Sequence, residues 1–188
     1  EDAQREQDAP GGVAVTESPA FKQFFGNSKV VDAAGRPLPV FHGTAEDFSV
    51  FGHDRTGEAT GHATSPLGHF FTPDRAQAEG YARNASDGRP ADQRVVDAYL
   101  HIEKPYTMSL DQAQRIETPG MARAVRAQLE AKGYDGVHLP EQNAWVAFHP
   151  EQIKSASENS GAFDRANPNI YFDRAANVDD SGKQDRPG

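Results

Sequence analysis

The residues of this chain best suited to chemistry follow short strand-like runs. His42 and Gly43 lie in the segment 40–44 (VFHGT), directly after a β-branched and an aromatic residue. Phe70 follows a glycine and a histidine in a second such run, and Tyr81 lies eleven positions later. Histidine supplies directed hydrogen bonds, and aromatic rings supply faces on which a planar ligand can stack. Taken singly, each element is typical of a turn or a core position, so their order along the chain carries the information.

Other kinds of catalytic or metal site find little support in the sequence. The chain has no cysteine, which excludes thiolate nucleophiles, disulfides and Cys-based zinc sites. His53, His62 and His69 lie in or beside a glycine-rich segment at no spacing typical of metal ligands, so we expect no metal site. Neither a P-loop nor the glycine fingerprint of a Rossmann dinucleotide site occurs.

The composition favours one acidic domain with polar flanks. Apolar residues make up 36% of the chain, the mean hydropathy is -0.74 and the formal net charge is -9. An acidic chain without a Lys/Arg cluster does not favour nucleic-acid binding, and no apolar run approaches the ~18 residues of a membrane span. We expect a flexible linker at 1–19, one domain at 20–173 and a flexible tail at 174–188.

Local patterns predict the elements that must position these residues. Capping residues and helical periodicity predict helices at 18–25, 75–82 and 119–132. Strand patterns occur at 29–31, 39–42, 68–72, 95–103, 136–139, 145–148, near Ile153 and at 170–172. The glycines of 52–68 predict a mobile loop. Strands outnumber helices without a regular strand–helix–strand order, which favours an α+β domain over a parallel doubly wound one.

The ordered series of His42, Gly43, Phe70, Tyr81 and the run 145–148 (WVAF) resembles the NAD-binding core of ADP-ribosyltransferases of the His–Tyr–Glu type. The resemblance implies an ADP-ribosyltransferase-like α+β fold, with two packed antiparallel-rich sheets and short flanking helices, and NAD as co-substrate. It also implies that His42 hydrogen-bonds the adenine-side ribose and that the backbone of Gly43 pairs with the nicotinamide amide. Phe70 and Tyr81 would sandwich the nicotinamide ring, and Thr44 completes the residues expected to contact NAD.

Two positions depart from that family. Phe70 stands where the family has a tyrosine, a change that preserves stacking and removes a hydroxyl. Ala144 stands where the resemblance places the catalytic glutamate, which would stabilise the sugar cation. We therefore expect the chain to be inactive as written, either because a glutamate was deliberately replaced or because it is a naturally inactive NAD-binding relative. Gln142 corresponds to a position that orients the acceptor in related transferases.

The resemblance covers about residues 21–172 and is closest to transferase domains in polyvalent proteins of phages and mobile elements. Further segments carry it, namely 134–137 (YDGV), 152–156 (QIKSA), 159–163 (NSGAF) and 167–170 (NPNI). It implies a mono-ADP-ribosyltransferase of the toxin or effector type, acting as a monomer on a macromolecular acceptor, with protein favoured over nucleic acid. We expect a fragment of a longer bacterial or phage protein that is delivered to a target-cell cytoplasm. Two alternatives stay open, an NAD glycohydrolase and a non-catalytic NAD-binding module.

Overall fold

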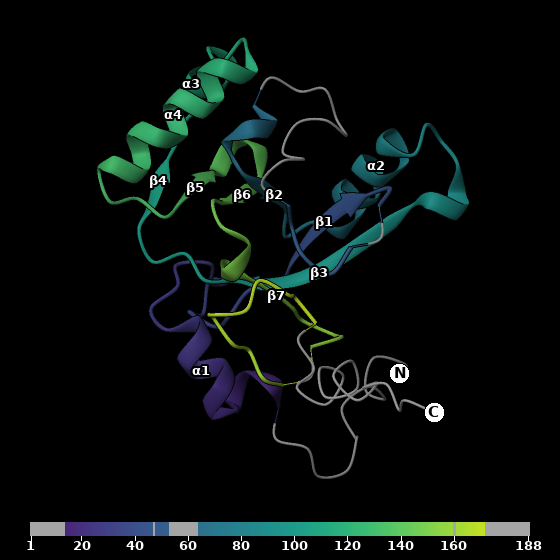
Figure 1. Ribbon diagram of the computed structural model, residues 1–188, viewed down its shortest axis with the longest axis vertical. Coiled ribbons are helices and arrows are strands. Elements are labelled where there is room, and N and C mark those ends of the chain that lie inside the picture. Colours follow the sequence, from purple (N-terminus) through teal and green to yellow (C-terminus); the bar gives the residue numbers. More distant parts are fainter. Residues whose placement is uncertain (1–13, 47, 53–63, 160, 172–188) are drawn as a thin grey trace, which may run out of the picture.

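Two β-sheets with helices on their outer sides form the body of the molecule (Figure 1). The computed structural model describes residues 14–46, 48–52, 64–159 and 161–171. Besides the α-helices and strands given below, short 3-10 turns occur at η1 (Val15–Glu17), η3 (Ser65–Leu67), η4 (Pro90–Asp92), η5 (Pro140–Gln142) and η6 (Pro150–Gln152).

The first sheet has the strand order β1-β3-β7 and is antiparallel throughout. Its strands are β1 (Val40–Thr44), β3 (Arg94–Leu100) and β7 (Ile153–Ser155). Apolar and polar residues alternate along β3, and this alternation buries Ala98 and Leu100 on one face. On the other face, Tyr99 meets Phe21 of α1 (Pro19–Phe25) edge to face, with ring centroids 4.9 Å apart. Helix α1 therefore covers the outer side of this sheet.

The second sheet has the strand order β2-β6-β5-β4. Its strands are β2 (His69–Phe71), β6 (Ala144–Ala147), β5 (Gly136–Leu139) and β4 (Pro105–Thr107). All neighbours are antiparallel except β4 and β5, which are parallel. Two helices, α3 (Leu110–Gln114) and α4 (Pro119–Ala131), cover its outer face. Their buried residues Ala113, Ala122 and Leu129 pack with Val137, Leu139 and Val146 of the sheet.

The largest apolar core lies between the two sheets. The second sheet contributes Phe71, Trp145 and Ala147, and the first contributes Val40, Ala98, Leu100 and Ile153. Hydrogen bonds also join the sheets at one bridge, where the Phe41 N–H donates to the Thr72 carbonyl at 2.7 Å and the Thr72 N–H donates to the Phe41 carbonyl at 2.9 Å. Apolar burial drives the packing, and the bridge fixes β1 against the end of β2.

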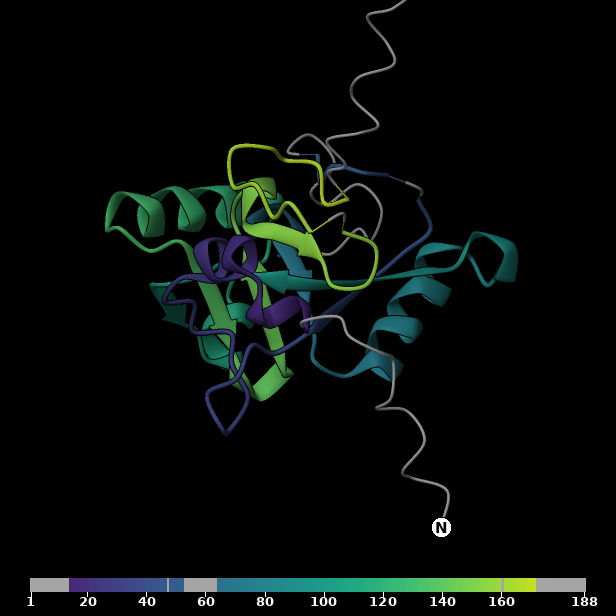
Figure 2. The same ribbon diagram turned by 90° about the horizontal axis from the view of Figure 1, so that it is seen from below.

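Helix α2 (Arg75–Ala85) packs on the face of β1 that points away from this core. It begins at Asp74, whose carboxylate accepts from the N–H groups of Ala76 and Gln77 at 2.9 and 3.3 Å. Such a cap satisfies backbone donors that have no partner within the helix. Figures 1 and 2 both show α2 and the turn η4 to one side of the two sheets. Helix α2 therefore contacts the body of the molecule mainly through β1 and β3.

Most of the predicted elements are present, with ends within three residues of the predicted ones. The strand predicted at 29–31 is wrong. Val31 forms only an isolated bridge with Pro37, because the Asp32 carboxylate accepts from the N–H groups of Ala34 and Arg36 and closes a tight turn. The strand predicted at 170–172 is also wrong where the structure describes it, because the isolated bridge there joins Asn169 to Val50.

Three further segments differ from the prediction or lie partly outside the described residues. Strand β4 begins at Pro105, soon after the strand predicted at 95–103, and neither β4 nor α3 was predicted. Of the loop predicted at 52–68, residues 53–63 lie outside the described residues, and 65–67 form η3. Of the predicted flexible flanks, 1–13 and 174–188 lie outside the described residues, whereas 15–19 form η1, the cap of α1 and its first residue. The domain limits of 20–173 stay a prediction.

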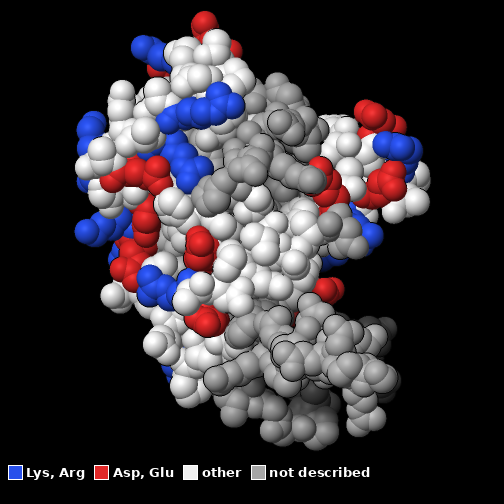
Figure 3. All heavy atoms as spheres, in the orientation of Figure 1, with Lys and Arg blue, Asp and Glu red and all other residues white. Residues whose placement is uncertain are grey.

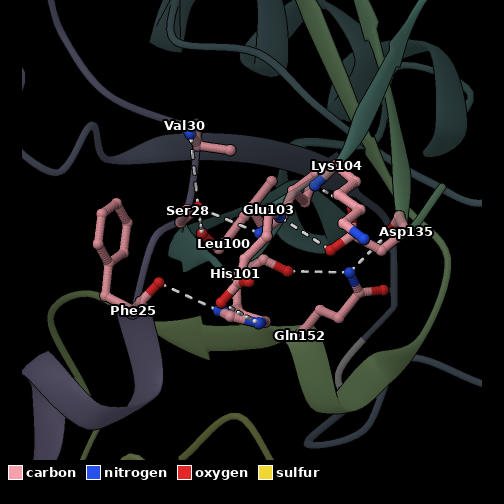
Figure 4. Close-up of polar contacts among 10 residues, drawn as sticks. Phe25, Ser28, Val30, Leu100, His101, Glu103, Lys104, Asp135 and Gln152 are labelled. Atoms are coloured by element: carbon pink, nitrogen blue, oxygen red, sulfur yellow. Dashed lines mark hydrogen bonds and ion pairs between the residues drawn. The ribbon is translucent and has the colours of Figure 1, made fainter. Parts of the chain in front are cut away.

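A buried polar network ties the end of β3 to its neighbours (Figure 4). The Ser28 hydroxyl donates to the carbonyl of Leu100 at 2.6 Å. The side-chain amide of Gln152 donates to the carbonyls of His101 and Asp135 at 2.9 and 2.8 Å. Since a buried polar group without a partner is costly, these bonds fix the segment after β3 against β7 and the start of β5.

Charged side chains of both signs are interspersed over the coloured part of the face drawn in Figure 3. Lysines and arginines alternate there with aspartates and glutamates, and no wholly basic area stands out. Within the residues that the structure describes, no helix is long and apolar enough to cross a membrane.

Candidate active site

His42 is held in one orientation by a hydrogen bond to the second sheet. Its Nδ1 lies 2.7 Å from the carbonyl oxygen of Phe70 in β2. A carbonyl only accepts, so Nδ1 carries the proton and Nε2 of the neutral ring is an acceptor. The ring packs against Phe51 and Phe71, with centroids 5.1 and 5.4 Å away. This burial, partly offset by the bond to Phe70, holds the pKa of His42 below its usual range, so the ring is neutral at pH 7.

The backbones of β1 and α2 approach each other closely at Gly43. A Cβ on this residue would lie 1.9 Å from the carbonyl oxygen of Ala78 and 2.7 Å from the nitrogen of Ala82. Both distances are far below van der Waals contact, so only glycine permits this packing. The absent side chain of Gly43 thus makes room for the helix that carries Tyr81.

The backbone N–H and C=O of Gly43 face the edge of β1 opposite β3. Phe41, two residues earlier, directs its N–H and C=O away from β3 and toward Thr72. Backbone groups of an antiparallel strand alternate in direction, so the N–H and C=O of Gly43 point the same way as those of Phe41. Gly43 therefore offers one donor and one acceptor side by side, which matches the two groups of a primary carboxamide.

Thr44 points to the opposite face of β1 from Gly43 and is buried, with 6% of its surface exposed. Its hydroxyl accepts a hydrogen bond from the N–H of Glu46 at 3.0 Å. That bond stabilises the turn after β1. The described contacts of Thr44 are thus local, and its expected contact with NAD stays a prediction.

Phe70 is half-buried and pairs with Val146, so both side chains lie on the face of the second sheet that α3 and α4 cover. A cavity of about 10 Å³ adjoins its ring, lined also by Leu139, Ala113 and Gln142. That volume suffices for a single water. A ring stacked on Phe70 must therefore lie outside this cavity.

Tyr81 lies on α2 with 44% of its surface exposed. Its hydroxyl accepts from the side-chain amide of Gln77, one helical turn earlier, at 3.4 Å. Ala78 and Ala82 occupy the helix face that packs on β1. The ring of Tyr81 is thus available at the surface beside the turn that precedes β6.

Position 144 is the first residue of β6 and pairs with Leu139. Extending the pairing of β2 with β6 by one residue sets Ala144 opposite Thr72 and on the same face as Phe70. Only 8% of Ala144 is exposed, and its neighbours are apolar. The position is therefore close to the expected aromatic residue, but it offers a methyl group where a carboxylate was expected.

Hydrogen bonds to α3 and to α2 hold the turn before position 144 from two sides. On one side, the carboxylate of Glu141 accepts from the N–H of Leu110 at the start of α3, at 3.0 Å. On the other side, the carbonyl of Gln142 accepts from the side-chain amide of Gln77 at 3.2 Å. Asn143 then adopts a left-handed conformation, with φ 51°, and leads into β6. Glu141, the nearest carboxylate in sequence to position 144, is therefore engaged at α3.

The predicted residues come together through two contacts between elements. One is the bond from His42 to Phe70, and the other runs from Tyr81 through Gln77 to Gln142. Sequence reasoning missed Gln77, because its link to Gln142 spans 65 positions and depends on how the strands pair. In the described part of the chain, no group of three or more His, Asp or Glu residues could hold a metal ion.

A family model described as ADP-ribosyltransferase in polyvalent proteins matches residues 32–163, which is more than half of the 188 residues. Searches of curated proteins and of solved structures find no match.

Proposed function

This chain belongs to the family of ADP-ribosyltransferases in polyvalent proteins and has the α+β fold of two antiparallel-rich sheets expected for it; we propose that it binds NAD beside β1, β2 and α2. We further propose that it is a mono-ADP-ribosyltransferase of the toxin or effector type, from a bacterial or phage protein, and that its acceptor is a protein. As written, the chain transfers ADP-ribose slowly or not at all, because position 144 carries no carboxylate.

The observation that best supports this proposal is the hydrogen bond between His42 and Phe70. It joins the histidine of the first strand to the backbone of the aromatic position in the second sheet. It also leaves Nε2 as an acceptor, which is the atom a ribose hydroxyl needs as its partner.

The chemical groups around this bond fit a nicotinamide. The N–H and C=O of Gly43 face the same edge and match the acceptor and donor of the nicotinamide amide. Phe70 and Tyr81 provide aromatic faces for the ring. The neutral state of His42 avoids placing a second positive charge near the nicotinamide ring, which is positively charged in NAD.

The reaction explains why position 144 matters. NAD supplies an ADP-ribosyl group, and breaking its bond to nicotinamide develops positive charge on the ribose. A fixed carboxylate facing that charge typically contributes ~10²–10³ in rate. Ala144 contributes none of this, although the residues that would hold NAD are independent of it.

Replacing Ala144 with glutamate tests the proposal directly. We expect Ala144→Glu to raise nicotinamide release from NAD by at least about a hundredfold, measured by chromatography, and to leave the NAD affinity nearly unchanged. Ala144→Gln is the matched control, because it has the same size and no charge. Both changes should lower the melting temperature, since only 8% of Ala144 is exposed. Release at background from a folded Ala144→Glu protein would refute the assignment of position 144.

A non-catalytic NAD-binding module is the second candidate, favoured by the apolar, buried surroundings of Ala144. The same experiment separates the candidates. A module binds NAD and stays inactive after Ala144→Glu, whereas a glycohydrolase then releases free ADP-ribose, and a transferase labels a protein acceptor that mass spectrometry identifies.

A further inference from the structure

One side-chain amide connects three elements around the candidate site. Gln77 lies on α2, and its Oε1 accepts from the Thr72 hydroxyl at the end of β2, at 2.8 Å. Its Nε2 donates to the carbonyl of Gln142 at 3.2 Å and to the hydroxyl of Tyr81 at 3.4 Å. Gln77 thus links three parts of the site: Thr72 at the end of β2, Tyr81 on α2, and Gln142 in the turn before position 144.

The orientation of the Gln77 amide is fixed by its partners. A backbone carbonyl only accepts, so the nitrogen of Gln77 must face Gln142. The Thr72 hydroxyl already accepts from the N–H of Asp74 at 3.1 Å, which leaves its own proton for Oε1 of Gln77. Exchanging the oxygen and nitrogen of this amide would set two acceptors against each other at Gln142. The Gln142 carbonyl and the Thr72 hydroxyl therefore set the orientation of the amide, and the Tyr81 hydroxyl, which can donate or accept, is compatible with it.

The bond to Gln142 bears on position 144 more than on NAD binding. Gln142 is two residues before position 144, and the turn between them contains the left-handed Asn143. The bond of Glu141 to Leu110 holds the same turn from the side of α3. The bond from Gln77 holds this turn from the side of α2. The orientation of residue 144 therefore depends on both hydrogen bonds.

We propose that Gln77 is a positioning residue that sets the turn 140–143, and through it the side chain at position 144, against helix α2. This inference rests on the proposed function, because it gives that turn a role in transfer of ADP-ribose. The reacting atoms are touched by residue 144 and not by Gln77. Loss of the bond therefore lowers the rate of the chemical step and leaves ground-state binding of NAD largely intact.

The test compares Gln77→Glu with the unchanged residue in the Ala144→Glu protein. A carboxylate can still accept from Thr72, but it cannot donate to Gln142 and repels that carbonyl. We expect kcat for nicotinamide release to fall about tenfold to a hundredfold, as for a catalytic group displaced by about 1 Å, while KM for NAD changes less than about threefold. Glu79→Gln, an exposed change of the same size on α2, should leave both constants unchanged.

A pH profile distinguishes positioning from general loss of structure. A protonated carboxyl at position 77 again carries a donor for Gln142, so acidification should restore part of the lost rate. We compare two Ala144→Glu proteins, one with Gln77→Glu and one without. The kcat of the first divided by the kcat of the second should rise as the pH falls toward the pKa of the carboxyl at position 77. Thr72→Val removes the hydroxyl that orients the amide, and it should lower kcat in the same direction without a pH-dependent recovery.

Hydrogen exchange tests the hydrogen bond from Gln77 to Gln142 in a way that does not depend on enzymatic activity. In the chain with Ala144 retained, Gln77→Glu should speed exchange of the N–H groups at 143 and 144, and Glu79→Gln should not. If the Ala144→Glu protein is active and Gln77→Glu leaves its kcat unchanged, the inference is overturned and the proposed function stands. If the Ala144→Glu protein is inactive, the proposed function fails. Unchanged exchange at 143 and 144 would then overturn the positioning role as well.

Discussion

Adding one methyl group at Gly43 should push helix α2 away from β1. The new Cβ would lie 1.9 Å from the carbonyl oxygen of Ala78, whereas an ordinary contact begins near 3.4 Å, so the two must separate by about 1.5 Å. The nearest atoms are backbone atoms, which cannot move aside as a flexible side chain would. The whole helix must therefore shift, and the buried contacts of Ala78 and Ala82 are lost.

Overpacking of this kind costs about 1–3 kcal/mol. In a chain of this length each kcal/mol lowers the melting temperature by about 2–4 °C, so Gly43→Ala should melt about 2–12 °C below the parent in a calorimetric scan. It should also weaken NAD binding, because the displaced helix carries Tyr81.

A glycine on the same helix provides the matched control. Gly80 lies within α2, and a Cβ there would meet only the side chain of Arg83, at 3.7 Å. Gly80→Ala should therefore stabilise the protein by about 0.5–1 kcal/mol. Equal melting temperatures for Gly43→Ala and the parent would show that α2 does not rest on Gly43, and the account of that residue would be wrong.

Two further changes test the site and the core. Tyr81→Ala should weaken NAD binding in titration calorimetry by about twofold to thirteenfold, the equivalent of about 0.5–1.5 kcal/mol of stacking; Tyr134→Ala, which disturbs a remote ring pair with Tyr106, should leave the affinity unchanged. Lys154 is fully buried in β7, where its ammonium donates to the carbonyls of Asn167 and Asn169, and burial lowers its pKa from 10.5 to about 8. Between these pH values the unfolded chain binds more protons at this residue, so its contribution makes the unfolding free energy rise from about pH 8 to pH 10.5. Denaturant titrations of a Lys154→Met protein should lack that rise, and an identical slope in both proteins would contradict the assignment to Lys154.

The parts of the fold that depend on local signals could be predicted from the sequence. Ser18 caps α1 by accepting from the N–H of Phe21, and Pro19 begins the helix, as the residue types indicate. The alternation of apolar and polar residues along β3 likewise predicted which face of that strand is buried. Such signals lie within a few residues of each other and need no knowledge of the tertiary structure.

Two of the failures involve contacts between distant segments, and one involves a local turn. The short strand β4 pairs in parallel with β5, and nothing local in 105–107 indicates that partner. The segment 29–31 has strand-forming residues, but the Asp32 turn leaves it only one bridge. Gln77 looked like an ordinary polar residue of a helix surface, because its partner Gln142 is brought near only by the pairing of β2 with β6.

Three of the contacts that hold the site together end on main-chain atoms. His42 donates to the carbonyl of Phe70, Gln77 donates to the carbonyl of Gln142, and Phe41 exchanges backbone bonds with Thr72. Every residue type presents the same carbonyl, so substitutions at positions 70 and 142 leave these bonds in place. The scaffold and the reaction chemistry can therefore diverge independently in evolution: a transferase can lose or regain its carboxylate at position 144, or exchange tyrosine for Phe70, while the binding frame for its substrate is inherited unchanged.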